Sequence, residues 1–369
     1  MTNAASAGGC LRCRLGKKSA RDQTTEEDDA VSMMKSDIRK TGKFYHDQLS
    51  DTIGDTPLVR LRNIPREHGV EATILLKLEY FNPTGSVKDR MAVYVLKEAI
   101  RKGELKPGGT IIEATSGNTG AAVAMFAAAN GYKAVLTIPD KMSAEKVDTL
   151  RAYGAEVHIC PTAVPPDSPE SYYETARRIL ESTPGAYMLG QYHNLDNIKA
   201  HYMTTGPELY EQTEGGRFDV FVAGIGTGGT MSGTAKYLKE KRPEIEVVAV
   251  DVEGSVYYQY FKEKTVGEGR PYLVEGIGDD MLCPTVDFSV IDAMYQVNDE
   301  QSFRMARDLA RKEGILAGGS GGSALHAALE HGRKLTADKT VIVIVPDNGT
   351  KYISKMYSDA WMAEKGFLK

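Results

Sequence analysis

Short apolar runs rich in β-branched residues alternate with longer amphipathic stretches along most of this chain. This alternation restricts the possible folds more than any other feature. The runs that predict strands are 73–78, 110–114, 133–138, 156–159, 218–223, 246–251 and 340–345. The stretches that predict helices between them are 87–102, 119–130, 144–153, 171–181 and 230–241. Strands separated by helices in this way form parallel sheets with helices on both faces. The sequence therefore predicts an α/β protein with doubly wound open sheets.

Length and composition predict a soluble protein with more than one core. The chain has 369 residues, which is more than one simple core usually holds, so we expect two subdomains. Hydrophobic residues make up 41% and charged residues 26%, and the net charge of -5 gives no reason to expect nucleic acid or an anionic membrane as a partner. No apolar run approaches the roughly 18 residues that span a bilayer, and the start lacks the apolar segment of a secretory signal. We expect a cytoplasmic protein.

The first 43 residues differ from the rest because they almost lack apolar periodicity. They contain a basic patch and an acidic run, a composition that predicts a disordered tail. Two of the four cysteines, Cys10 and Cys13, form a C-x-x-C pair there, and the others are Cys160 and Cys283. No second Cys or His pair follows at the spacing of a zinc site. We therefore expect reduced thiols and no metal.

The first of four unusual loops contains a lysine at the start of a helix. Ligands of open α/β sheets bind at the carboxyl ends of strands, where such loops lie. Residues 82–90 read NPTGSVKDR, and Lys88 opens the predicted helix 87–102. The positive end of the helix dipole disfavours a cation there and favours a neutral amine, which Schiff-base chemistry or proton transfer requires. The alternative is an exposed lysine in an ordinary turn.

The second loop, TSGNTG at 115–120, follows an apolar strand and begins a helix. Capping that helix needs only one of these residues, whereas two glycines and four side-chain donors are present. Backbone N–H groups at such a turn bind anions, so the loop predicts a carboxylate or phosphate site.

The third loop, GIGTGGT at 224–230, leaves two classes of cofactor open. It contains the pattern G-x-G-x-x-G, and the next predicted strand ends at Asp251, near where a dinucleotide site places its ribose acid. An NAD(P)-dependent oxidoreductase is therefore an alternative. Against it, the pattern begins past residue 215, and its two threonines suit a compact monophosphate.

The fourth loop combines a glycine run with a turn near the end of the chain. Residues 317–323 read AGGSGGS before a predicted helix at 324–330, and PDNGT at 346–350 follows an apolar strand. Glycine runs at strand-to-helix junctions let the backbone approach a ligand, so we expect these loops to contribute to the same site.

Together the loops resemble those of the cysteine synthase and cystathionine β-synthase family, which are fold-type II pyridoxal-phosphate enzymes. The resemblance runs from about residue 49 to 368. NPTGSVKDR is similar to the cofactor-lysine segment, TSGNTG to the substrate-carboxylate loop and GTGGT to the phosphate loop. DSPES at 167–171, EGIG at 275–278 and the stretch 298–320 are most similar to the cystathionine β-synthase branch.

The resemblance implies roles for individual residues. Lys88 would carry pyridoxal 5′-phosphate and act as base and acid, Asn118 would bind the 3′-oxygen of the cofactor, and Asn348 would face its pyridine nitrogen. The residues implied to hold the phosphate are Gly226, Thr227, Gly228, Gly229 and Thr230. Those implied to bind the substrate are Thr115, Ser116, Gly117, Thr119, Gln191 and Gly276.

The implied reaction is β-replacement on L-serine, or an activated serine, by a thiol. L-Homocysteine as the thiol would give cystathionine, and the alternatives are cysteine synthesis from O-acetylserine and sulfide, or synthesis of another β-substituted alanine. The family also implies a homodimer. It further implies a smaller mobile domain at 82–192, which carries Lys88 and the carboxylate loop, and a larger cofactor domain at 44–81 and 193–369.

Two departures from the family pattern bear on this interpretation. Eukaryotic members bind haem through a Cys and a His about a dozen residues apart, but Cys10 and Cys13 are far from the nearest histidine, His46. We therefore expect no haem. Asp279 stands where relatives often carry a tyrosine, which leaves the substrate selectivity open.

Overall fold

The computed structural model describes residues 45–165 and 167–368. The predicted tail at 1–43, with Cys10 and Cys13, lies outside these residues. Within the described ranges no helix is long and apolar enough to cross a membrane. The same part of the chain contains no group of three His, Cys, Asp or Glu side chains placed to hold a metal ion.

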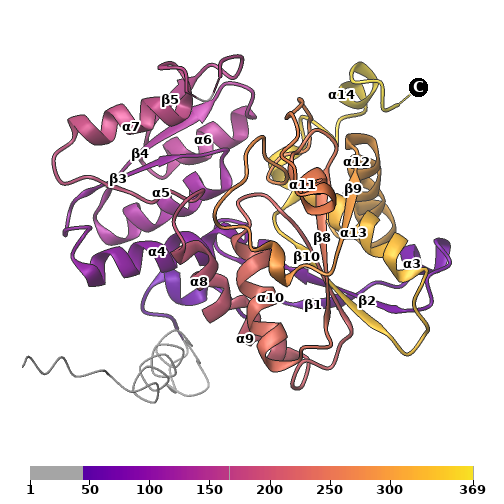
Figure 1. Cartoon of the computed structure of the whole chain (residues 1–369). Helices are drawn as coiled ribbons and strands as arrows, with labels where there is room; N and C mark the ends of the chain where they lie inside the picture. Colours follow the sequence, from indigo (N-terminus) through magenta and orange to yellow (C-terminus); the bar gives the residue numbers. More distant parts are fainter. Residues whose placement is uncertain (1–44, 166, 369) are drawn as a thin grey trace, which may run out of the picture. The chain divides into compact units, whose positions relative to one another are not determined.

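A six-stranded sheet contains strands from both ends of the described chain (Figure 1). Only its first strand runs antiparallel to its neighbour, and the other pairs are parallel. In spatial order the strands are β1 (Leu58–Arg60), β2 (Thr73–Leu78), β10 (Thr340–Val345), β7 (Val220–Gly224), β8 (Glu246–Val252) and β9 (Ala293–Val297).

A second, fully parallel sheet is formed by the middle of the chain. Its strands, in spatial order, are β5 (Glu156–Cys160), β4 (Lys133–Pro139), β3 (Thr110–Ala114) and β6 (Tyr187–Met188). The helices connecting them are α5 (Asn118–Asn130), α6 (Ala144–Ala152) and α7 (Tyr172–Ser182), and α4 (Lys88–Lys102) leads from β2 of the larger sheet into β3. Val135 packs with the α7 residue Ala176, whereas its neighbour Leu136 lies against Gly120 of α5. Since successive strand residues face opposite sides, α5 and α7 cover opposite faces.

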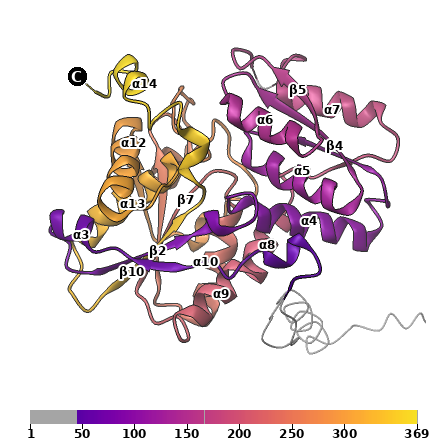
Figure 2. The same cartoon turned by 180° about the vertical axis from the view of Figure 1, so that it is seen from behind.

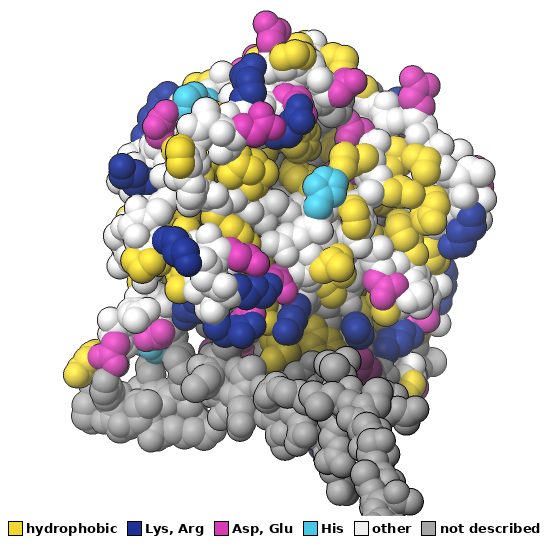
Figure 3. All heavy atoms as spheres, turned by 60° about the vertical axis from the view of Figure 1, so that its left-hand side comes forward, with side chains coloured by type: hydrophobic (Ala, Val, Ile, Leu, Met, Phe, Trp, Pro, Cys, Tyr) yellow, Lys and Arg dark blue, Asp and Glu magenta, His cyan; other side chains and the backbone are white. Residues whose placement is uncertain are grey.

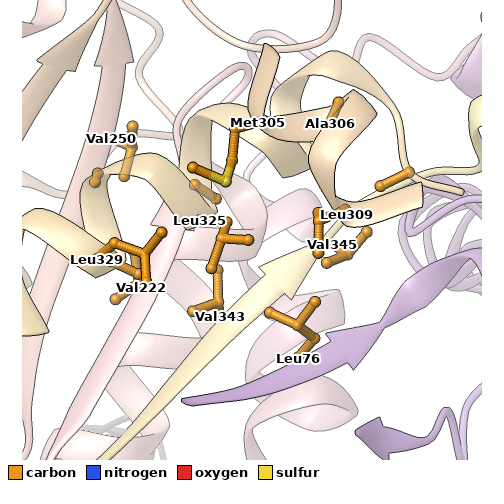
Figure 4. Close-up of a cluster of buried hydrophobic side chains, with 14 of the residues drawn as sticks. Leu76, Val222, Val250, Met305, Ala306, Leu309, Leu325, Leu329, Val343 and Val345 are labelled. Atoms are coloured by element: carbon orange, nitrogen blue, oxygen red, sulfur yellow. The ribbon is translucent and has the colours of Figure 1, made fainter. Parts of the chain in front are cut away.

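The larger sheet is also covered on both faces (Figures 1 and 2). Val222, Val250 and Val343 pack against Met305 and Leu325 on one face (Figure 4). On the other face the alternate residues pack against α9 and α10. Each side chain buried in this way contributes about 1.5–3 kcal/mol. The helices of this part are α3 (Asn63–Glu67), α8 (Asp196–Met203), α9 (Thr205–Gln212), α10 (Gly229–Lys241), α11 (Tyr257–Glu263), α12 (Asp299–Asp308), α13 (Gly319–Gly332) and α14 (Asp359–Glu364).

The predicted strands and helices are confirmed, with shifts of one or two residues at their ends. The glycine run at 317–323 was interpreted wrongly as a loop, because α13 begins at Gly319 and includes most of the run. Packing between helices explains these glycines. A Cβ on Gly322 would lie 2.1 Å from the carbonyl oxygen of Ser302 on α12. The glycine lets the two helices approach closely.

Candidate active site

Lys88 is the first residue of α4, at the carboxyl end of the six-stranded sheet. The backbone N–H of Val87 donates to the carbonyl oxygen of Pro346, just after β10, at 2.8 Å. Ser86 and Asp347 also form an isolated bridge. The side chain is only partly covered, yet burial lowers the pKa of its amine from 10.5 to about 8. The nearby Cys283, Asp347 and Glu113 oppose this shift only in part.

A buried ion network that sequence reasoning missed fixes the helix two residues beyond this lysine. Arg90 donates to Glu79 at 2.7 Å and to Glu208 at 2.8 Å, and Lys77 also pairs with Glu208. These partners come from β2, the turn after it and α9, so their separation along the chain hides the network from any local pattern. The network holds the start of α4 against the larger sheet.

The Asn118 amide is held at both ends. Its Nδ2 donates to Asp347 Oδ2 at 2.8 Å, and its Oδ1 accepts from Lys351 Nζ at 2.7 Å. Tyr352 Oη donates to the same Asp347 oxygen at 2.5 Å, while Asp347 Oδ1 is buried without a hydrogen-bond partner. One N–H of Asn118 therefore remains for a ligand, and the orientation of the amide is fixed in advance.

The carboxylate loop is built around buried Thr115. Its Oγ1 accepts from the backbone N–H groups of Gly117 and Gly120 at 3.0 and 2.9 Å, so this hydroxyl shapes the loop from inside. Ser116 is half-buried. The first turn of α5 leaves the N–H groups of Asn118 and Thr119 without partners inside the helix. Together with the helix dipole, these donors favour an anion beside Ser116.

Gln191 lies beside this loop, as predicted, although it comes from the segment after β6. Thr119 Oγ1 donates to its Oε1 at 2.7 Å, and its Nε2 donates to the carbonyl oxygen of Ala114 at 3.2 Å. Buried Glu113, which sequence reasoning missed, accepts from the N–H groups of Gly190 at 2.7 Å and Gln191 at 3.2 Å. Burial raises the pKa of Glu113 to about 7 despite these bonds.

The phosphate loop joins β7 to α10. Gly228 is the N-cap of α10 with φ of 86°, a conformation that favours glycine. A Cβ on Gly229 would lie 1.8 Å from Asn197 Oδ1, so this glycine allows Asn197 to pack behind the loop. Asn197 Nδ2 also donates to Thr227 Oγ1 at 3.0 Å. The loop thus places the positive end of α10 at the end of the sheet.

Thr230, in the first turn of α10, lies beside a histidine that the sequence analysis did not single out. Its Oγ1 is 3.2 Å from His201 Nε2, and His201 Nδ1 is 2.8 Å from Thr205 Oγ1. Burial holds the pKa of His201 well below 6.5. The imidazole is therefore neutral near pH 7 and adds no charge to the phosphate loop.

Two further predicted residues lie at the edges of the site. A Cβ on Gly226 would lie 2.8 Å from the carbonyl oxygen of Gly276, so these two loops are in contact, and Gly276 itself has a φ of 81°. Asn348 is half-buried, and its side chain accepts from the N–H of Thr350 at 2.8 Å. The side chain of Asn348 therefore caps a turn, and its amide N–H groups remain as possible donors.

Asp251, the acidic residue that a dinucleotide site at the third loop would need, is not available to a ligand. Asp251 is fully buried, and its Oδ2 accepts from the N–H of Tyr258 at 2.8 Å. A carboxylate turned into the protein cannot bind a ribose hydroxyl. The geometry instead joins one partly neutral lysine to two anion-binding helix ends.

Lys88 interacts with Glu113, which precedes the loop of α5, and with His201, which lies beside Thr230 of α10. An α/β fold with a lysine near two helix N-termini is typical of a cofactor-dependent enzyme. Residues 49–347 match the family described as "Pyridoxal-phosphate dependent enzyme". The chain belongs to this family, and its fold is fold-type II.

Two curated relatives are named cystathionine beta-synthase. The chain is 45% identical over 332 residues to the cystathionine beta-synthase of Mus musculus, which is 90% of this chain and 59% of the relative. It is 42% identical over 320 residues to the cystathionine beta-synthase of Saccharomyces cerevisiae, which is 85% of this chain and 63% of that relative. Thus it spans about three fifths of these relatives' length.

Among solved structures, an O-acetylserine dependent cystathionine beta-synthase from Helicobacter pylori has a TM-score of 0.77 at 37% identity, covering 85% of this chain and 99% of that one. An O-ureido-L-serine synthase has a TM-score of 0.78 at 35% identity, covering 86% and 99%.

The residues present fit pyridoxal phosphate. The glycines at 226, 228 and 229 pack tightly against neighbouring loops and have no room for a Cβ. The loop therefore has little side-chain bulk, and its backbone N–H groups at the N-terminal start of α10 are suited to a phosphate. Lys88 supplies the amine that such a cofactor requires, and the oriented Asn118 amide supplies a donor.

Proposed function

We propose that this enzyme catalyses β-replacement on L-serine, or an activated serine, by a thiol. L-Homocysteine as the thiol gives cystathionine. The observation that carries this proposal is the partly neutral Lys88 amine between two anion-binding helix ends. Relatives named cystathionine beta-synthase support the choice of reaction, and the O-acetylserine dependent member keeps an activated serine open.

The cofactor would be held by residues from both sheets. The phosphate loop, 226–230, would bind the phosphate, Asn118 the 3′-oxygen and Asn348 the pyridine nitrogen. Pyridoxal phosphate, which Lys88 would hold in the resting enzyme, would supply an electron sink that, when joined to the substrate amine, makes the substrate Cα–H acidic and lets the β-substituent leave. No haem is part of the proposal.

The residues of this chain would bind the substrate and move its proton. Ser116, Thr119 and the N–H groups at the start of α5 would hold the substrate carboxylate. Gln191 would join them by releasing one of its internal hydrogen bonds, and Gly276 would leave space beside the amino group. Lys88 would take the proton from Cα and return it after the thiol adds to Cβ. Its pKa of about 8 suits both directions, because an acid–base catalyst works best near the ambient pH.

The proposal also covers domain movement, oligomeric state and the kinds of ligand. The carboxylate loop lies on the second sheet, and we propose that residues 82–192 move as a smaller domain over the bound substrate while 44–81 and 193–369 hold the cofactor. A cytoplasmic homodimer is proposed from the family. Small amino acids are the expected ligands, with no nucleic acid or membrane as partner. On the face in Figure 3, basic and acidic side chains are interspersed, which agrees with the modest net charge.

Product analysis tests the reaction. Purified, cofactor-loaded enzyme receives serine with homocysteine, or O-acetylserine with sulfide, and the products are identified by mass. Cystathionine at the higher kcat/KM supports the proposal, whereas preference for the second pair makes the enzyme a cysteine synthase. An enzyme that forms neither product contradicts the proposed function.

Replacing Lys88 tests its role in the same assay. Lys88→Ala should reduce turnover at least 1,000-fold, on the order expected when one group serves as both acid and base, and should abolish the visible absorption of lysine-bound cofactor. Lys97→Ala is the matched control, because Lys97 is exposed on the same helix. Retained turnover in Lys88→Ala would assign the chemistry to another residue.

A further inference from the structure

Three tyrosines gather beside the carboxylate loop. Tyr172 and Tyr173 begin α7, and Tyr192 follows Gln191. The ring centroids of Tyr172 and Tyr173 are 4.0 Å apart, and those of Tyr173 and Tyr192 are 5.4 Å apart with the rings nearly perpendicular. The hydroxyls of Tyr172 and Tyr192 lie 3.5 Å apart, and all three side chains stay partly exposed. With Asp279 they form what we call the tyrosine–aspartate cluster.

Asp279 is a partly buried carboxylate without a cationic partner. Its Oδ1 accepts from the N–H groups of Asp280 and Met281 at 2.9 and 3.3 Å, and Oδ2 is 3.8 Å from Cys283 Sγ. None of the ion pairs among residues 45–165 and 167–368 includes it. Its negative charge helps to raise the pKa of each of the three tyrosines. Burial and the neighbouring Asp280 raise the pKa of Asp279 to about 7, so its carboxyl is only partly ionised near neutral pH. A cation bound beside Asp279 would favour the ionised form and would take the place of the missing partner.

The cluster lies close to Lys88 and the phosphate loop through residues that follow Asp279 in the chain. Cys283 Sγ lies 3.8 Å from Asp279 Oδ2, and Cys283 is also one of the groups close enough to interact with the Lys88 amine. Burial raises the pKa of the Cys283 thiol to about 12, so it is a neutral neighbour of both groups. Thr285 Oγ1 donates to the carbonyl oxygens of Thr227 in the phosphate loop and, at 3.3 Å, of Tyr192. None of these side chains takes part in the steps assigned above to Lys88, the carboxylate loop or the phosphate loop. The cluster therefore lies next to the site and has no assigned task.

We propose that the tyrosine–aspartate cluster binds the ammonium group of the second substrate, and so selects an amino-acid thiol over sulfide. This inference rests on the proposed β-replacement and adds the class of nucleophile to it. Tyrosine rings attract a cation through their π faces, and a carboxylate adds a charged hydrogen bond. The first substrate needs neither, since its amino group goes to the cofactor and its carboxylate to the loop on α5. An ammonium group at Asp279 would hold the thiol of the same molecule near the reacting carbon.

The test compares nucleophiles that differ only in this group. With the first substrate saturating, kcat/KM is measured for homocysteine, for 4-sulfanylbutanoate, which lacks the ammonium, and for sulfide. The intact enzyme should favour homocysteine over 4-sulfanylbutanoate by roughly 10- to 100-fold, the range for one hydrogen bond to a charged group. Asp279→Asn should remove this preference through KM and leave the two amine-free nucleophiles within about threefold. Glu268→Gln, which changes an exposed carboxylate between α11 and β9 to an amide, is the matched control and should keep the preference.

The outcomes separate the inference from the proposed function. Equal use of homocysteine and 4-sulfanylbutanoate by the intact enzyme overturns the inference without any variant. An equal loss for all three nucleophiles in Asp279→Asn also overturns it, because the residue would then support the site in general. Absence of product from every thiol overturns the proposed function and the inference with it.

Discussion

At the scale of single residues, Lys88 shows how position in the fold changes a side chain's chemistry. Its amine sits at the positive end of α4 and is shielded from water by the segments around it, although the side chain stays partly exposed. Both effects favour the neutral form. Placing the lysine at a helix start allowed its function to be predicted from sequence. The extent of burial that lowers its pKa to about 8 depends on residues far away in the chain.

We expect the reactivity of Lys88 to report this pKa. Only the neutral amine is a nucleophile, so acylation of cofactor-free protein at Lys88 should increase with pH through a midpoint near 8 and level off above it. Peptide mass spectrometry after brief treatment with an amine reagent measures the midpoint, with exposed Lys97 as the reference for reagent reactivity. A midpoint above about 9.5, approaching that of an ordinary lysine, would contradict the assigned environment.

At the scale of elements, long strands and amphipathic helices were predictable and short edge strands were not. β2, β3 and β10 have the predicted bounds, because each is five or six residues long and mostly apolar, which forms a clear local pattern. β1 and β6 contain three and two residues, too few for a period, and only pairing with β2 and β3 makes them strands. The glycines of α13 were misleading because local propensity disfavours a helix there. Contact with α12 overrides that propensity.

The close approach of α12 and α13 predicts a stability loss for Gly322→Ala. The new Cβ would lie 2.1 Å from the Ser302 carbonyl oxygen and 2.8 Å from Ala306 N, so the helices must separate. Overpacking of this kind typically costs about 1–3 kcal/mol of the free energy of unfolding. Urea unfolding of the variant and the parent protein measures the loss. Gly319→Ala, in the same helix, meets only side chains, the Phe303 ring at 3.2 Å and Met356 Sδ at 3.5 Å, and should lose less stability. Equal stability of the two variants would mean that the packing of α12 on α13 does not require glycine at position 322.

At the scale of the whole described molecule, one buried carboxylate links the two sheets. Glu275 accepts from Lys146, on α6, at 2.5 Å and from Lys355, beyond β10, at 2.7 Å. Burial alone would raise the pKa of Glu275, but the two ammonium groups lower it below 4.5. The Glu275 carboxyl therefore binds a proton more readily in the unfolded chain than in the folded one. Its contribution to the free energy of unfolding is complete above about pH 4.5 and is lost as the pH falls further.

This linkage predicts a pH-dependent effect of Glu275→Gln. At pH 7 the variant should be less stable by about 3–5 kcal/mol, because Lys146 is left buried without its partner. The difference should shrink below pH 4, where the carboxyl of the intact protein is itself protonated. Urea unfolding of both proteins at pH 7 and below pH 4 measures the difference in the free energy of unfolding. Glu300→Gln, which breaks an exposed pair with Arg304, should cost less than about 1 kcal/mol. A pH-independent difference would show that the charge is not responsible.

The sequence alone determined most of the longer strands, several of the helices between them, the loops at the strand ends and the lysine among them. It did not predict β1, β6, β9 or the helices α8, α9, α11 and α12. The predicted features depend on local patterns of apolar, glycine and hydroxyl residues, which act over a few positions. The tertiary structure decided which partners orient those residues. Asp347 holds Asn118 across 229 positions, and Glu113 holds Gly190 across 77. It also decided that the Thr115 hydroxyl shapes its loop from within and that the charge of Asp279 acts on tyrosines from distant segments. A contact between distant segments depends on the packing of the sheets and leaves no periodic signal in the chain.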